Sequence, residues 1–173
     1  MDGLTIRPLD AADVQPIADA FAAIGWRKPA SQYERYLSEQ ARGERLVLVA
    51  WEHERFAGYL TIVWESGYPP FRAAGIPEIV DFNVLPRCRR HGIGTLLMDA
   101  AERLIAERSS EAGIGVGMDP DYGPAQRLYV KRGYVPDGRG LSTGDRYVVP
   151  GETVRVDDGL VLHFTKQLRQ RRG

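Results

Sequence analysis

The chain has 173 residues, and its 23 Lys and Arg are balanced by 23 Asp and Glu, so the formal net charge is zero. A chain of this length predicts one domain, here residues 1–173, that can bury a substantial hydrophobic core. The neutral charge argues against nucleic acid and against an anionic membrane as the main partner, because both favour a large basic excess.

The cysteine and histidine content excludes further classes of site. Cys88 is the only cysteine, so an intramolecular disulfide is excluded, and a loop cysteine without a paired His or Asp favours an inert thiol. His53, His91 and His163 are widely scattered and predict no metal site. The amino terminus lacks a basic and then apolar signal, and no apolar run approaches the ~20 residues that span a bilayer. We therefore expect a cytoplasmic protein.

The first half of the chain predicts a strand, two helices and a hairpin. Leu4 to Arg7 has strand character, and Asp10 is suited to begin a helix. The apolar stripe of that helix consists of Val14, Ile17, Ala18 and Phe21. A second helix is predicted from Ser31 to Ala41. Two strands joined by a polar turn follow, Arg45 to Trp51 and Phe56 to Trp64.

The second half of the chain alternates strands with helices. Its predicted elements are a strand Ile79 to Val84, a helix after a glycine loop, a strand Ile114 to Met118, a helix Ala125 to Arg132, and strands near Tyr147 to Val156 and Leu160 to Lys166. The buried face of the helix after the glycine loop consists of Leu96, Leu97, Ala100, Ala101, Leu104 and Ile105. This order of elements predicts a mixed α/β fold.

The glycine loop has the composition of a phosphate-binding turn. Gly92 and Gly94 lack Cβ, so the backbone can approach a ligand closely and leave the first amides of the next helix available to an anion. Arg87, Arg89, Arg90 and His91 add positive charge. The simpler interpretation is a strand-to-helix turn with a solvated basic rim. The spacing fits neither the nucleotide P-loop nor the three-glycine dinucleotide fingerprint.

Two motifs together resemble the GNAT family of N-acetyltransferases. The acetyl-CoA loop of that family has Arg or Gln, two residues, Gly, any residue and Gly or Ala, and Arg89, Gly92 and Gly94 match it in register. A second family motif, Asn-x-x-Ala-x-x-Leu-Tyr-x-x-x-Gly-Phe/Tyr, is similar to the segment from Tyr122 to Tyr134 at every fixed position except the first. Tyr122 replaces the Asn that contacts the pantetheine arm in the family.

The resemblance implies both a fold and a reaction. The family fold is a mixed, mostly antiparallel central sheet of about six to seven strands flanked by about four helices. The reaction transfers an acetyl group from acetyl-CoA, the co-substrate, to a primary amine by direct attack in a ternary complex. A lysine-like amine with a pKa near about 10.4 must lose a proton before it attacks, and the departing thiolate needs a proton donor.

The same resemblance implies catalytic roles. Tyr129 matches the tyrosine that acts as general acid toward the CoA sulfur. Glu78 stands at the position of the base glutamate in the histone-type branch, and strand alternation predicts that Asp81 lies on the opposite face. Another branch has its glutamate on the next strand, where this chain has Gly117. Glu78, Asp81, and water or another residue therefore all stay open as the base.

The expected acetyl-CoA contacts are backbone groups of two segments. The pantetheine arm is expected along Phe82, Asn83 and Val84. The pyrophosphate is expected at the amides of Arg89, Arg90, His91, Gly92, Ile93, Gly94 and Thr95, with the side chains of Arg89 and Arg90 as secondary contacts.

The acceptor is less constrained than the donor. Candidate acceptor contacts are Trp26, Tyr33, Trp64, Glu65, Tyr68 and Phe71, with Pro69 and Pro70 between the last two. An aromatic wall with one acid suits a small cationic amine, although exposed loop aromatics can equally close a core or a dimer interface. A polyamine, an amino acid, an aminoglycoside and a protein amino terminus or lysine all stay compatible. A non-catalytic acyl-CoA-binding module is the alternative from another class, and a homodimer is expected by family analogy only.

Overall fold

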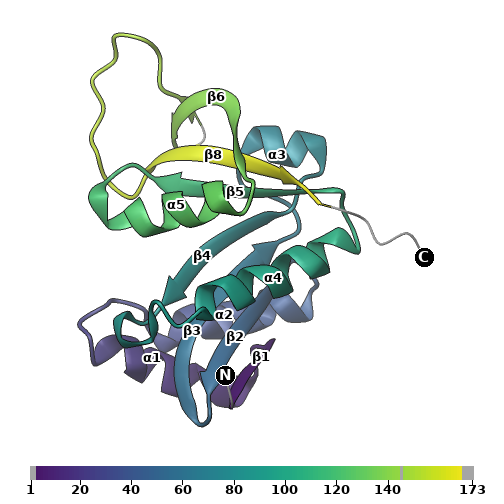
Figure 1. The fold of residues 1–173 in the computed structure, drawn as a ribbon, viewed down its shortest axis with the longest axis vertical. Coiled ribbons are helices and arrows are strands. Elements are labelled where there is room, and N and C mark those ends of the chain that lie inside the picture. The colour runs from purple at the N-terminus through teal and green to yellow at the C-terminus, as the bar shows by residue number, and fades with distance from the viewer. Residues whose placement is uncertain (1–2, 145, 169–173) are drawn as a thin grey trace. The chain divides into compact units, whose positions relative to one another are not determined.

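The structure is a computed structural model that describes residues 3–144 and 146–168 (Figure 1). Within these residues the chain has eight strands in a mostly antiparallel sheet and five α-helices, which confirms the predicted mixed α/β class. The strands are β1 (Leu4–Pro8), β2 (Arg45–Glu52), β3 (Arg55–Val63), β4 (Glu78–Val84), β5 (Glu111–Gly117), β6 (Val135–Thr143), β7 (Arg146–Tyr147) and β8 (Leu160–Gln167). The helices are α1 (Val14–Ala22), α2 (Ala30–Ala41), α3 (Pro69–Ala74), α4 (Ile93–Ala106) and α5 (Gly123–Lys131).

Tertiary contacts divide the chain into two compact units. The first unit comprises Met1–Trp64 and Ile79–Leu104, and the second comprises Glu65–Glu78 and Ile105–Gly173. In the first unit the strand order is β1-β2-β3-β4, with antiparallel pairing of β1 to β2 and of β2 to β3. Helices α1 and α2 contact β3 and β2, and α4 lies in front of these strands in Figure 1.

The start of α1 shows how local sequence sets this arrangement. Asp10 accepts a hydrogen bond from the amide of Ala12, and the Asp13 carboxylate accepts one from the amide of Asp10, which forms a capping box. Arg7 of β1 pairs with Asp13 at 2.6 Å and so ties the first strand to the helix start. The predicted stripe of α1 is buried, as the sequence indicated: Val14, Ile17, Ala18 and Phe21.

The second unit is built around β5 and β8. Its strand order is β5-β8-β6-β7, and all of these pairs are antiparallel. Gly113, Gly115 and Gly117 alternate along β5 and therefore face the same side of the strand. A Cβ atom on Gly113 would lie 2.4 Å from the Phe71 ring, and one on Gly117 would lie 2.5 Å from the Tyr122 ring. The bare backbone of β5 thus provides the surface on which aromatic rings pack.

Three sequence predictions in this unit were wrong. The aromatic residues before β4 were expected in a loop, but the segment contains α3, and Tyr68 and Phe71 are buried with Ile76, as in the core alternative that the sequence left open. The strand expected near Tyr147 to Val156 is limited to Arg146–Tyr147, and β6 was missed. Gly138 and Gly140 have positive φ within β6, where the pairing with β8 is irregular, so a bulge hides the strand pattern.

The packing of Phe71 on Gly113 leads to a prediction about stability. Gly113→Ala places a methyl group against a fully buried ring, so we expect the free energy of unfolding to fall by about 1–3 kcal/mol. Urea denaturation measures this change. Gly67→Ala is the matched control, because nothing lies within 4 Å of a Cβ atom there. Equal unfolding free energies for the two variants would contradict the close packing of Phe71 on β5.

Candidate active site

The loop between β4 and α4 is a tight turn with two left-handed residues. Arg90 has φ 64° and Gly92 has φ 78°. The Leu96 amide donates to the Gly92 carbonyl at 3.0 Å. The amides of Ile93, Gly94 and Thr95 therefore precede the first helical hydrogen bond, at the positive end of the helix dipole. This backbone geometry is the one that the sequence predicted for an anion-binding helix start.

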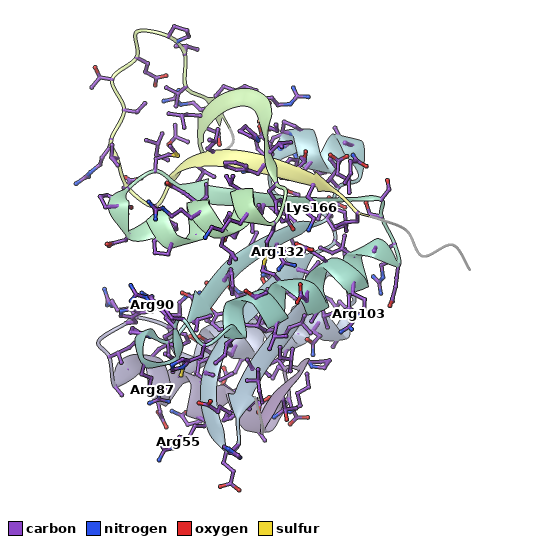
Figure 2. The ribbon with its side chains drawn as sticks, in the orientation of Figure 1. Arg55, Arg87, Arg90, Arg103, Arg132 and Lys166 are labelled. Carbon is purple, nitrogen blue, oxygen red and sulfur yellow. The ribbon has the colours of Figure 1, made fainter. Side chains whose placement is uncertain are left out.

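The basic side chains of the loop differ in their hydrogen bonds and ring contacts. Figure 2 shows Arg87 and Arg90 on the loop and Arg55 at the beginning of β3. Arg87 donates to the Phe56 carbonyl at 3.1 Å. Arg89 donates to the Val84 carbonyl at 3.1 Å and has its guanidinium 5.8 Å from the centre of the Trp26 ring. Arg87, Arg89, Arg90 and His91 are all exposed, and the Arg89 hydrogen bond also links the loop to the end of β4.

Glycines allow the loop helix and β3 to approach β4 closely. A Cβ atom on Gly94 would lie 3.2 Å from Cζ of Phe82, and one on Gly58 of β3 would lie 2.6 Å from the Asn83 carbonyl oxygen. Phe82, Asn83 and Val84 are each half-buried. The two segments expected to hold acetyl-CoA, the end of β4 and the start of α4, therefore lie in contact within the first unit.

Asp81 lies at a backbone irregularity in β4 and is surrounded by donors. Its φ is 51°, which a residue with a Cβ atom rarely adopts within a strand. The donors to its carboxylate are Lys28 Nζ at 2.6 Å, Gln32 Nε2 at 2.9 Å, the Tyr36 hydroxyl at 2.8 Å, Asn83 Nδ2 at 2.9 Å and the Tyr59 hydroxyl in a short hydrogen bond. Two carboxylate oxygens offer about four lone pairs, so these donors occupy the acceptor capacity of Asp81.

The charge state of Asp81 follows from these contacts. Burial works against the ionised carboxylate, but the charge of Lys28 and the hydrogen bonds from Lys28, Tyr59 and Tyr36 outweigh it, and the pKa of Asp81 lies below its ordinary value. Asp81 is therefore a stably ionised group with little tendency to take up a proton.

Glu78 lies three residues earlier on the same strand, in the opposite electrostatic environment. It is 6% exposed, and its Oε2 accepts a hydrogen bond of 2.5 Å from the Ser66 hydroxyl. Burial raises the pKa of Glu78, and the Ser66 hydrogen bond opposes this only in part. The other oxygen of Glu78, Oε1, lies 3.9 Å from Nε2 of the His163 imidazole. Glu78 therefore has the raised pKa that a general base requires.

Tyr129 lies on α5 and is 4% exposed. Burial raises the pKa of Tyr129, and the nearby Tyr122 raises it further. The phenol is therefore protonated at neutral pH, as a general acid must be. The Tyr129 carbonyl accepts a hydrogen bond from the amide of Tyr134 at 3.0 Å, so the Gly and Tyr at the end of the second motif close the helix on which Tyr129 lies.

Tyr122, at the position of the family Asn, has a defined place in the second unit. Its ring packs against the backbone of Gly117, and its hydroxyl lies 3.0 Å from the Asp158 carboxylate. Gln126 of α5 donates to the Gly117 carbonyl at 2.9 Å. The end of β5 and the start of α5 are thus joined by Tyr122 and Gln126.

The residues expected to contact the acceptor fall into two groups. Tyr33, Tyr68 and Phe71 are buried, and Tyr33 packs edge-on against Tyr36 and Tyr59. These rings support the core rather than an open wall, which is the alternative that the sequence left open. Trp26 is half-buried and stacks on Phe21, Trp64 is half-buried, and Glu65 is exposed.

Sequence reasoning missed the partners of both carboxylates. Lys28, Gln32 and Tyr59 around Asp81 come from distant parts of the chain and show no motif. His163 near Glu78 was treated only as one of three scattered histidines. An available signal was its position inside the apolar strand Leu160–Gln167, where His163 stands between Leu162 and Phe164.

Residues 3–144 and 146–168 contain neither a metal-binding cluster nor a membrane-spanning helix. No group of three or more His, Cys, Asp or Glu side chains in this part of the chain could hold a metal ion. Among the same residues, no helix is both long enough and apolar enough to cross a lipid bilayer. Cys88 in the glycine loop is buried.

Known proteins agree with the fold and the motifs. The profile of the Acetyltransferase (GNAT) family matches residues 13–134, which include both motifs. No curated protein matches the chain. The structure resembles yncA of Salmonella typhimurium with its cofactor acetyl-CoA, with a TM-score of 0.69, 18% identity and coverage of 99% of this chain and 98% of that one.

Two further structures resemble this fold. Spermidine N-acetyltransferase from Vibrio cholerae, in complex with CoA and spermine, has a TM-score of 0.68, 14% identity and 98% coverage of both chains. Ribosomal-protein-alanine N-acetyltransferase from Brucella melitensis has a TM-score of 0.67 and 19% identity, and the match covers 95% of this chain and 99% of that one. The family profile covers more than half of the sequence, and the fold agrees with it, so the chain belongs to the Acetyltransferase (GNAT) family.

Proposed function

We propose that this acetyltransferase transfers the acetyl group of acetyl-CoA to a primary amine of a small cationic molecule, by direct attack of the amine in a ternary complex. We also propose that residues 1–173 form a single N-acetyltransferase domain. The observation that carries it is the loop from Arg89 to Thr95, whose left-handed residues and helix-start amides suit the pyrophosphate of acetyl-CoA.

Tyr129 is proposed as the general acid that protonates the departing CoA thiolate. Its position in the second motif supports this role, and so does its protonated state, because burial keeps the pKa of its phenol above the ordinary value. A donor of this kind lets the thiol, rather than the thiolate, leave the tetrahedral intermediate.

Glu78 is proposed as the base in preference to Asp81. The oxygens of Asp81 are occupied by five donors, and its pKa is lowered, so it is a weak proton acceptor. The pKa of Glu78 is raised by burial, which brings its basicity closer to the value useful at neutral pH. Asp81 instead takes the role of a positioning residue that fixes β4.

The acceptor proposal rests on the residues that remain accessible. Glu65 is exposed and Trp64 is half-buried, and a carboxylate and an indole ring are both groups that favour a cation. A protein amino terminus or lysine presents the same ammonium chemistry, so the acceptor panel below includes peptides.

The first prediction tests catalysis. Purified protein with acetyl-CoA and a panel of polyamines, amino acids, aminoglycosides and terminal peptides should release free CoA thiol when a suitable amine is present. Tyr129→Phe should lower kcat by about 100-fold, because the general acid is lost. Glu78→Gln should lower kcat similarly and remove the loss of activity that the wild type shows as the pH falls through the raised pKa of Glu78.

The control for this experiment is Asp19→Asn, which removes an exposed carboxylate of α1 in the first unit. Its rates should equal those of the wild type. Binding of acetyl-CoA without thiol release by any amine would favour the acyl-CoA-binding module. Unchanged rates in Tyr129→Phe would show that Tyr129 is not the general acid.

The second prediction tests the cofactor loop. Gly92→Ala forces a side chain into a left-handed conformation, which costs about 1–2 kcal/mol and is relieved by moving the loop amides. We therefore expect the Kd for CoA, measured by calorimetry, to rise by about tenfold. Gly138→Ala creates the same strain at φ 80° in β6 and should leave the Kd unchanged. Equal Kd values for Gly92→Ala and the wild type would show that the pyrophosphate of CoA does not bind at this loop.

The third prediction tests the role given to Asp81. Asp81→Asn removes the partner of Lys28 and should lower the free energy of unfolding at pH 7 by about 2 kcal/mol, since the pair is only partly shielded from water. A lowered carboxyl pKa contributes stability above the unfolded pKa of about 3.9 that is lost as the pH falls through the folded pKa. The difference between variant and wild type should therefore shrink below that pH.

Urea denaturation across the pH range measures this linkage. Asp19→Asn, which removes an exposed carboxylate of α1, is the control and should change the unfolding free energy little. A constant difference between Asp81→Asn and the wild type down to the lowest pH would show that the stabilisation does not depend on the charge of Asp81.

A further inference from the structure

A buried histidine in the second unit lies beside the proposed base. His163 of β8 is opposite Gly115 of β5, and a Cβ atom on Gly115 would lie 3.3 Å from His163 Nε2. The imidazole ring is stacked on the Tyr68 ring with a centroid distance of 3.6 Å and an angle of 1°, and the Phe71 ring meets it edge-on at 5.5 Å. These contacts fix the plane of the imidazole and therefore the directions of its two nitrogens.

Ser142 lies beside one of the two nitrogens of His163. Its Oγ lies 3.3 Å from His163 Nδ1 and 3.5 Å from the Val161 carbonyl oxygen. With its single hydrogen directed at Val161, whose carbonyl only accepts, the Ser142 oxygen can accept from Nδ1–H. In that tautomer the neutral imidazole has its lone pair on Nε2, the nitrogen nearer Glu78.

Ser66 determines which oxygen of Glu78 is left to face that lone pair. Its hydroxyl oxygen accepts from the amide of Tyr68 at 2.9 Å, so its hydrogen is donated to Oε2 of Glu78. The other carboxylate oxygen, Oε1, lies 3.9 Å from His163 Nε2. This separation is longer than a hydrogen bond, as expected for two acceptors, and one proton between them would join them.

Burial favours a single shared proton in this pocket. It raises the pKa of Glu78 and lowers the pKa of His163 to about 4, so that neither charged form is stabilised. The other titratable groups nearby are Asp137, which raises the pKa of His163, and Tyr68 and Tyr147. Asp137 accepts a hydrogen bond from the Tyr68 hydroxyl at 2.8 Å, and the raised pKa of Tyr68 keeps that phenol protonated. Two coupled groups of this kind titrate as a pair.

We propose that Glu78 and His163 form a carboxyl–imidazole pair that accepts one proton between Oε1 and Nε2, and that this proton is the one removed from the attacking amine. This inference rests on the proposed function of Glu78 as the base. The N–H bond of the amine breaks and an O–H bond forms on Glu78, which donates to the lone pair of Nε2. Release of the proton to water then restores the carboxylate, and His163 acts as a positioning residue throughout.

The decisive experiment observes the imidazole directly. Long-range proton–nitrogen NMR spectra of the full chain contain signals from three histidines, and His163→Gln identifies the signals of His163. We expect His163 to be neutral with its hydrogen on Nδ1 at neutral pH. We also expect its Nε2 shift to change in a step above the pKa of about 4 that burial gives the imidazole itself, and this higher step should be absent in Glu78→Gln. The signals of His53, which is exposed, should be the same in every variant and serve as the internal control.

Two results would overturn the pair. A hydrogen on Nε2 rather than Nδ1 in the wild type would leave His163 without the Nε2 lone pair that the shared proton requires. This measurement needs no variant. An Nε2 step that persists unchanged in Glu78→Gln would show that the two groups do not share a proton.

Kinetics separates the pair from the function on which it rests. His163→Phe keeps a ring against Tyr68 but removes the acceptor, so kcat should fall by about tenfold or more with the KM of the amine unchanged. An unchanged kcat would overturn the role of His163 in catalysis. If the Nε2 step depends on Glu78 but no amine accelerates thiol release in the wild type, the shared proton stands and the proposed function fails.

Discussion

A single ionised carboxylate fixes the strand that leads into the cofactor loop. Asp81 has a left-handed backbone within β4, a conformation that persists only where surrounding contacts enforce it. Its donors come from the segment before α2, from α2 itself, from β3 and from β4. The Asp81 carboxylate therefore connects all of these elements through hydrogen bonds. The path of β4 from Phe82 to Val84, and so the position of the loop that follows, depends on this polar network as well as on apolar packing.

The two carboxylates of β4 illustrate how environment assigns chemical roles. Asp81 is paired with a cation and saturated by donors, so its proton affinity is low. Glu78 is buried beside a neutral imidazole and has one hydroxyl donor, so its proton affinity is high. Two carboxylates three positions apart on one strand therefore differ in role: Asp81 is a structural anion and Glu78 is a candidate base. Such a difference in pKa between neighbouring carboxylates is expected where acid and base functions coexist.

Much of the fold could be predicted from the sequence because its signals are local. The stripe of α1, the hairpin of β2 and β3 and the strand, glycine loop and helix around Gly92 depend on periodicity and turn residues that are close in the chain. The bulged strand β6 could not be predicted, because Gly138 and Gly140 interrupt its alternation. Helix α3 was also missed, since its two prolines indicate a turn while also being favourable in a first helical turn.

The candidate site divides in the same way. Motif spacing identified the loop amides and Tyr129, because these positions are defined by neighbours in sequence. The partners that set the charge state of each carboxylate, Lys28 for Asp81 and His163 for Glu78, are separated from them by long stretches of chain. Only the tertiary structure brings such groups together, so the local sequence pattern could not predict these contacts.

The glycine face of β5 has an evolutionary consequence. Gly113 and Gly117 each leave a volume that a ring of another element fills, namely Phe71 and Tyr122, and the volume beside Gly115 is filled by Val161 and the His163 ring. A larger residue at any of these positions in a homologue must be accompanied by a smaller one at the partner position, or the ring is expelled. Related sequences should therefore vary at these three pairs in concert, and each pair sets the size of a side chain that borders a candidate catalytic residue.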